Sequence, residues 1–148
     1  MHHWSHNAVY VSYAITCVVL CCNLLILWAY SGAMRNRVKS TPNAEDVALF
    51  GGALTEIESP EIARVLRAHA NAQASIYPFL ALGLVYVLAA GPAAAAIAYF
   101  ATFCIARIVH SFAYVAGLQP WRTVSFAVGG LTTFILMAHV LWLVLIAA

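Results

Sequence analysis

Two arginines and an amide line one face of a helix expected in the middle of the sequence. At ~100° per residue, Arg64, Arg67 and Asn71 fall within a ~60° sector of that helix. The segment has no Gly or Pro before Pro78 and becomes apolar as it proceeds. Guanidinium groups entering an apolar medium are costly unless something anionic or polar meets them. This face therefore predicts a partner, either acidic side chains of the chain or an external anion.

A second polar face lies within a later apolar segment. Arg107, His110 and Tyr114 are spaced i, i+3, i+7 and occupy one side of a helix. An arginine at that depth costs ~2.5–3.5 kcal/mol on insertion scales, so we expect Arg107 to face a bundle interior and a partner there. Arg122 and Thr123 open the next apolar segment. Several arginines thus gather at one end of the predicted spans. We favour a ligand with carboxylates as their partner over the alternative, in which they form internal ion pairs and extend their side chains to lipid headgroups.

The elements that must position these faces are membrane-spanning helices. Hydrophobic residues make up 64% of the 148 and charged residues 8%, whereas a water-soluble domain carries about 25% charged residues. Four apolar segments, at about 8–30, 72–90, 93–115 and 122–146, can each cross ~30 Å of hydrocarbon. Tight turns at 91–92 and 117–120 make neighbours antiparallel. We predict an all-α integral membrane protein, a single-domain up-down four-helix bundle over residues 1–148.

One long polar connection, 31–59, joins the first two spans. We expect a short helix there with Asp46 in its first turn, ended by Gly51 and Gly52. Ser59 and Pro60 are typical of the N-cap and first residue of the following helix. All seven Lys and Arg lie at or near this end of the bundle, so the positive-inside rule predicts a cytoplasmic loop and both termini outside. No eukaryotic retention signal ends the chain, which favours a bacterial inner membrane.

Other partners are disfavoured. A net charge of +2 without a basic run gives no indication of nucleic acid binding. We expect no metal site, because no cysteine pair has metal-ligand spacing and the N-terminal His2, His3 and His6 belong to an end expected to fray. The cysteines lie in apolar segments, where they pack as small apolar residues; they are Cys17, Cys21, Cys22 and Cys104.

Four ordered blocks resemble the MAPEG superfamily (membrane-associated proteins in eicosanoid and glutathione metabolism). The most specific is RVLRAHAN at 64–71, followed by IYPF at 76–79. The others are TPNAED at 41–46 with the glycines 51–52, ARIVHSFAY at 106–114 and PWRT at 120–123. Together they cover about residues 23–146 and are most similar to the microsomal prostaglandin E synthase branch and its bacterial relatives.

The resemblance implies a homotrimer with glutathione bound between neighbouring subunits near the cytoplasmic face. It implies that Arg35 reaches glutathione from the adjacent subunit, and that Arg35, Arg67 or Arg107 takes a carboxylate of the tripeptide. The residues that it places at the glutathione site are Arg35, Arg67, Asn71, Arg107, His110 and Tyr114.

The resemblance places the chemistry at Arg122, Thr123 and Asp46. A guanidinium at a positively polarised helix N-terminus favours a thiolate, which is the nucleophilic form of a thiol. The Thr123 hydroxyl can donate a hydrogen bond to the same sulfur, and Asp46 matches an aspartate implicated near the reaction. A lipophilic substrate would arrive laterally from the lipid between spans. The implied function is a glutathione-dependent membrane transferase or peroxidase acting on lipophilic electrophiles or lipid hydroperoxides.

The chain departs from the family pattern at several positions. Ala74 stands where many members have an acid expected to hold the glutathione ammonium, and Ala63 also replaces an acid. Ala70 replaces an arginine and Phe126 a tyrosine of the prostaglandin synthase branch. Two alternatives follow: a non-catalytic lipid-binding protein of the same fold, and an enzyme that uses another thiol or anionic co-substrate. Four spans without a continuous polar face disfavour a transporter or channel.

Overall fold

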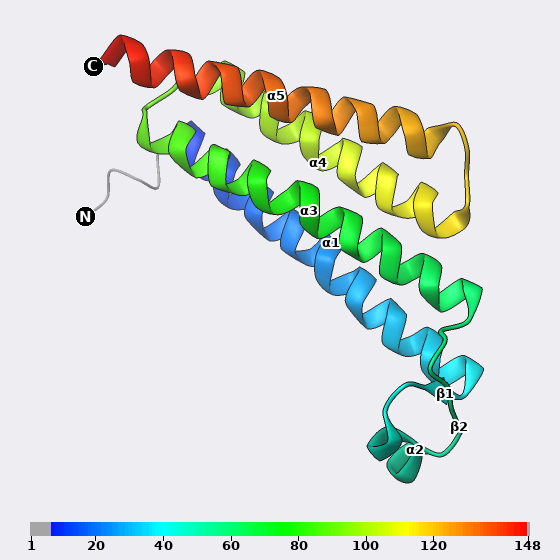
Figure 1. Cartoon of the computed structure of the whole chain (residues 1–148). Coiled ribbons are helices and arrows are strands. Elements are labelled where there is room, and N and C mark those ends of the chain that lie inside the picture. Colours follow the sequence, from blue (N-terminus) through cyan, green and yellow to red (C-terminus); the bar gives the residue numbers. More distant parts are fainter. Residues whose placement is uncertain (1–6, 148) are drawn as a thin grey trace.

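Four long helices, each antiparallel to the next along the chain, make up the bundle in the computed structural model, which describes residues 7–147 (Figure 1). Each is long and apolar enough to cross a membrane. Helices α3 and α4 form a central pair, which α1 packs against from one side and α5 from the other. The expected all-α four-helix membrane bundle is confirmed, whereas the three N-terminal histidines lie outside the described residues. The helices are α1 (Ala8–Val38), α3 (Pro60–Leu88), α4 (Ala93–Ala116) and α5 (Trp121–Ala147).

The first helix is longer than the expected span. Residues 31–38, which we assigned to the polar connection, continue α1 to Val38, so Arg35 and Arg37 lie in its last turn. Cations in a last turn interact favourably with the negative end of the helix dipole, and no proline interrupts the segment. Lys39 then ends the helix with a left-handed backbone. Basic residues beyond the apolar segment thus extend the helix instead of ending it.

The helix starts follow local capping chemistry. The Asn7 side chain accepts a hydrogen bond from the backbone N–H of Val9 at 2.9 Å and caps α1. Ser59 caps α3 with Pro60 as its first residue, as expected. Pro78 lies within α3, where helix-breaking residues are tolerated because neighbouring groups satisfy the freed carbonyl.

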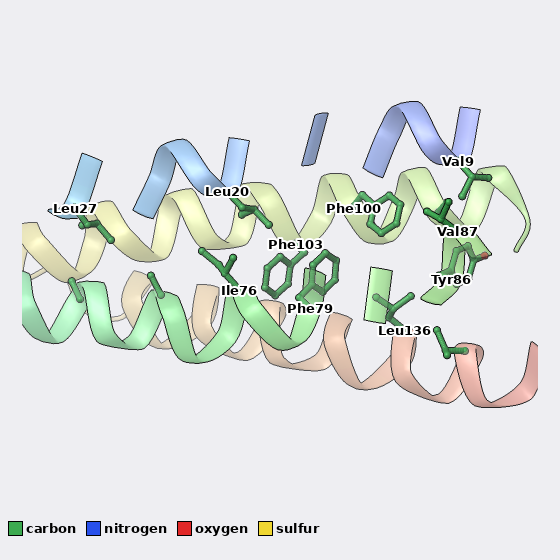
Figure 2. Close-up of a cluster of buried hydrophobic side chains, with 14 residues drawn as sticks. Val9, Leu20, Leu27, Ile76, Phe79, Tyr86, Val87, Phe100, Phe103 and Leu136 are labelled. Atoms are coloured by element: carbon green, nitrogen blue, oxygen red, sulfur yellow. The ribbon is translucent and has the colours of Figure 1, made fainter. Parts of the chain in front are cut away.

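The core centres on α3 and α4, and side chains of α1 and α5 complete it (Figure 2). The Phe79 and Phe103 rings stack with centroids 3.6 Å apart, and Phe100 meets Phe79 edge-on. All three are at most 1% exposed. Gly83 lets helices approach closely here, because a Cβ at this position would lie 3.0 Å from the Tyr13 ring. Such close packing, rather than exclusion of water, holds helices together in lipid.

A small polar module joins α1 to α3. Strand β1 (Ser40–Thr41) pairs in parallel with β2 (Ala53–Leu54), and the short helix α2 (Ala44–Phe50) connects them. The expected short helix with Asp46 in its first turn is confirmed. Gly52 has φ +109°, and a Cβ on it would meet the Lys39 carbonyl oxygen, so only glycine fits there. This module and the α4–α5 turn lie at the same end of the bundle (Figure 1).

Candidate active site

A pocket of about 240 Å³ opens between α3, α4 and the start of α5. The start of α5, which contributes to this pocket, lies at the end of the bundle that carries the polar module (Figure 1). Of the first predicted polar face only Asn71 lines the pocket, whereas His110 and Tyr114 come from the second face, and the N-terminal turn of α5 contributes Arg122 and Thr123. Five of the residues expected from the sequence therefore meet in one place. The pocket is lined by Asn71, His110, Tyr114, Arg122, Thr123 and Phe126.

Arg122 lies on the pocket wall within the first turn of α5. Its guanidinium carbon lies 5.0 Å from the centre of the Tyr114 ring. With the Gln119 amide oxygen turned toward it, Nη2 of Arg122 donates a hydrogen bond at 2.7 Å, and the amide nitrogen donates to Thr123 Oγ1 at 3.0 Å. Among residues 7–147, no carboxylate lies within ion-pair distance of Arg122. Its charge is thus held in position while remaining available to an anion.

His110 lines the same pocket, and one of its ring nitrogens has no partner among the described residues. Its Nδ1 lies 2.9 Å from the Arg122 carbonyl oxygen. Because a carbonyl only accepts, we assign the ring proton to Nδ1, which leaves Nε2 as an acceptor. Nε2 is buried and has no hydrogen-bond partner within the described part of the chain. A ligand N–H or O–H group in the pocket would satisfy it.

Arg107 points into the bundle, as expected, and its partner is Asn71. The side chain is 1% exposed, and its Nη2 donates to Asn71 Oδ1 at 2.8 Å. An arginine can only donate, so this bond fixes the amide of Asn71 with its nitrogen free to donate elsewhere. Asn71 also lines the pocket. Arg107 thus stands behind Asn71, whose amide faces the pocket.

The remaining expected residues lie elsewhere in a single chain. Arg35 binds Glu58 through an ion pair, with Nε 2.8 Å from Oε1. Asp46 accepts hydrogen bonds from Thr41 Oγ1 at 3.2 Å and from Asn43 Nδ2 at 2.9 Å.

A separate pocket of about 360 Å³ in the polar module is lined by both Arg35 and Asp46. Arg67 is exposed on α3 and lines neither pocket. A single chain therefore does not place Arg35, Asp46 or Arg67 in the pocket of Arg122.

Two supporting residues escaped the sequence reasoning. Gln119 contacts both Arg122 and Thr123, although we interpreted it only as part of a turn. The sequence does carry a signal for this role, because Gln119 lies three residues before Arg122 and just ahead of a helix start, where side chains commonly bond groups of the first turn. Glu58 lies in the polar connection before α3, but nothing in the sequence selects Arg35 as its partner.

Comparison with known proteins gives one consistent result. The model of the MAPEG family matches residues 13–142. Prostaglandin E synthase from Homo sapiens is 33% identical over 144 residues, which cover 93% of this chain and 95% of the relative. Microsomal glutathione S-transferase 1 from Homo sapiens is 33% identical over 128 residues, 83% of each chain. The resemblance inferred from four sequence blocks is confirmed: the chain belongs to the MAPEG family.

Proposed function

We propose that this multi-pass membrane protein is a glutathione-dependent transferase or peroxidase. Its substrates are lipophilic electrophiles or lipid hydroperoxides. The observation that carries the proposal is Arg122, which lies at the N-terminus of a helix, on a pocket wall, with no carboxylate partner within the described residues. Similarity to a synthase and to a glutathione S-transferase favours an enzyme over a non-catalytic lipid-binding protein.

Arg122 and Thr123 are the residues that would act on the sulfur. When bound, glutathione supplies a thiol, whose thiolate is the nucleophile. The guanidinium and the positive end of α5 favour that thiolate, and the Thr123 hydroxyl can donate a hydrogen bond to it. The Tyr114 ring and Gln119 limit the movement of Arg122, so its charge needs little reorganisation.

The pocket also has complementary groups for a peptide. His110 Nε2 can accept a hydrogen bond from an amide N–H, and the free amide nitrogen of Asn71 can donate to a carbonyl or carboxylate. Arg107 orients Asn71 from behind. Arg67, exposed at the same end of α3, is available to a carboxylate of the tripeptide.

We propose that Arg35 and Asp46 complete the site from a neighbouring subunit. In one chain they lie in a pocket separate from that of Arg122. A homotrimer, as the family resemblance implies, would let one subunit's polar module face the next subunit's α3–α5 pocket. We further propose that the polar module faces the cytoplasm of a bacterial inner membrane, with both termini outside and lipids around the apolar surface.

The test is direct. The protein is purified in detergent, and the ultraviolet absorbance of bound thiolate and the conjugation of a chlorodinitrobenzene-type electrophile are measured. We expect both signals in the wild type, and a fall in turnover of about 100-fold or more in Arg122→Ala, comparable to the loss of one charge-stabilising donor. Arg37→Ala is the matched control, because it removes the same charge from an exposed position outside the pockets described here.

Two results would overturn the proposal. The first is a wild type with neither signal at millimolar glutathione. The second is an Arg122→Ala variant whose lost activity comes with loss of the oligomer, which would make Arg122 a structural residue.

A further inference from the structure

A third pocket lies between α1, α3 and α4 and shares no lining residue with the two pockets described above. Its volume of about 320 Å³ is near the lower end of the range for small-molecule sites. The start of α3 and the end of α4 lie at the end of the bundle that carries the polar module (Figure 1). We name it the interfacial pocket, and its lining includes Tyr30, Met34, Glu61, Arg64, Val65 and Val115.

The lining residues place this pocket at the boundary between hydrocarbon and headgroups. Tyr30 ends the first expected span, and Val115 ends the third. On α3 the pocket is lined instead by polar turns that precede the expected span 72–90. Tyrosine is also enriched at membrane–water interfaces, where its ring is apolar and its hydroxyl is hydrated. The pocket therefore lies at the depth where phospholipid headgroups begin.

Apolar faces lead from the pocket toward the middle of the membrane. Ile26 lies one turn before Tyr30 on α1 and is 67% exposed, and Ile108 lies two turns before Val115 on α4 and is 47% exposed. The two side chains share helix faces with residues that line the pocket. A lipid beside the bundle can thus hold its chains against these faces while its headgroup occupies the pocket.

Two charges of opposite sign line the pocket, and no ion pair within the chain neutralises either of them. Glu61 and Arg64 lie three residues apart on α3, so their Cβ atoms are ~5–6 Å apart. Among residues 7–147, the one ion pair joins Arg35 to Glu58. Glu61 and Arg64 are therefore paired neither with each other nor with another described residue.

Gly117 lets the Arg64 guanidinium lie against the end of α4. The glycine has φ +71°, and a Cβ on it would collide with Nη1 of Arg64. A cation at this place interacts favourably with the negative end of the helix, which carries only about half an elementary charge. Because a guanidinium has five N–H donors, Arg64 can bind an anion in the pocket as well.

We propose that the interfacial pocket binds the headgroup of a phospholipid that carries a primary ammonium group, of the phosphatidylethanolamine type. The phosphate accepts hydrogen bonds from Arg64, and the ammonium donates to the Glu61 carboxylate. Two carbons separate these groups in the headgroup, which suits charges one helical turn apart. A purely anionic headgroup is repelled by Glu61, and a trimethylammonium group has no N–H to donate. The inference does not depend on the proposed function.

The first experiment compares three lipids with identical chains. Phosphatidylethanolamine, phosphatidylcholine and phosphatidylglycerol are each titrated into the purified protein in detergent, and bound lipid is counted by native mass spectrometry. We expect the first to bind about 5- to 10-fold more tightly than the other two, which corresponds to one hydrogen bond between charged groups. Equal affinities would mean that lipid surrounds the protein without selection and would overturn the inference.

Charge variants locate the site. Glu61→Gln should reduce the preference over phosphatidylcholine to about 2-fold or less, and Glu61→Lys should reverse the preference in favour of phosphatidylglycerol. Arg64→Gln should weaken all three lipids about 5-fold. Glu56→Gln and Arg37→Gln are the matched controls, because they remove the same charges from exposed positions outside the pocket. Circular dichroism verifies that each variant is folded.

The Glu61 variants keep the test decisive if Arg64→Gln does not fold, since Arg64 also contacts the end of α4. Reversal by Glu61→Lys, with Glu56→Lys binding as wild type, supports the inference. A Glu61→Lys variant that retains the preference for phosphatidylethanolamine would place the headgroup elsewhere and overturn it.

Two soluble zwitterions test whether the ligand is a lipid. Phosphoethanolamine has both charged groups but no chains, so it should bind at least about 100-fold more weakly than the lipid. Saturating glutathione should leave lipid binding unchanged, because the interfacial pocket and the Arg122 pocket share no residue. Tight binding of phosphoethanolamine, or competitive displacement of the lipid by glutathione, would assign Glu61 and Arg64 to a soluble ligand and overturn the inference.

Discussion

The bond between Arg107 and Asn71 allows a quantitative test of how the site is held. Replacing Asn71 by Leu removes the one side-chain partner that the described residues give a guanidinium that is 1% exposed, and leaves it only the 3.5 Å contact with the backbone carbonyl oxygen of residue 71. Neutral hydrogen bonds between membrane helices average about 0.6 kcal/mol, because the unfolded state in the membrane also finds partners. A bond to a charged group contributes about 1.5–3 kcal/mol, and an unpaired buried charge costs more. We therefore expect Asn71→Leu to lower the free energy of unfolding by about 2–3 kcal/mol.

A double-mutant cycle separates the bond from other effects of the substitutions. Arg107→Met removes the buried charge, so that a polar side chain at position 71 no longer has a charged group to stabilise. The double variant Asn71→Leu with Arg107→Met should therefore be about as stable as Arg107→Met alone, since replacing both partners by apolar groups is nearly neutral.

The measurement is unfolding of the purified protein by sodium dodecyl sulfate in mixed micelles, followed by loss of helical circular dichroism. Asn36→Leu, a change of the same type at an exposed position on α1, is the control. If the two single substitutions each cost less than about 0.5 kcal/mol and simply add, the two residues are independent and the reasoning fails.

Two further predictions concern the contacts between helices. Asn23 of α1 donates to Ser111 Oγ of α4 at 3.0 Å, a hydrogen bond between two membrane helices; Asn23→Leu should cost about 0.6–1.7 kcal/mol in the same assay, and no change would mean that the bond adds nothing. Gly83→Val should destabilise by about 1–3 kcal/mol because its side chain would collide with the Tyr13 ring. Gly130→Ala, which adds a methyl group in open space, should stabilise by up to about 1 kcal/mol. Equal effects at the two glycines would show that packing at Gly83 is not tight.

The helical period explains which features of the site could be predicted. Residues three, four and seven apart share a face whatever the neighbouring helices do, so Arg107 and His110 were expected to point the same way, and both are buried in the bundle. Hydropathy located the four spans because a membrane demands long apolar helices. The bond of Asn23 to Ser111 follows a related rule, since an amide in a span needs a partner on another helix.

Contacts that depend on how one element sits against another could not be predicted. The pairing of Arg107 with Asn71 requires the rotation and height of α3 against α4, which no local pattern encodes. The ion pair of Arg35 with Glu58 depends on the path of the polar module between two helices. The extension of α1 to Val38 could not be predicted either. Its end depends on capping and on charged side chains beyond the apolar segment, and hydropathy does not locate a helix end there.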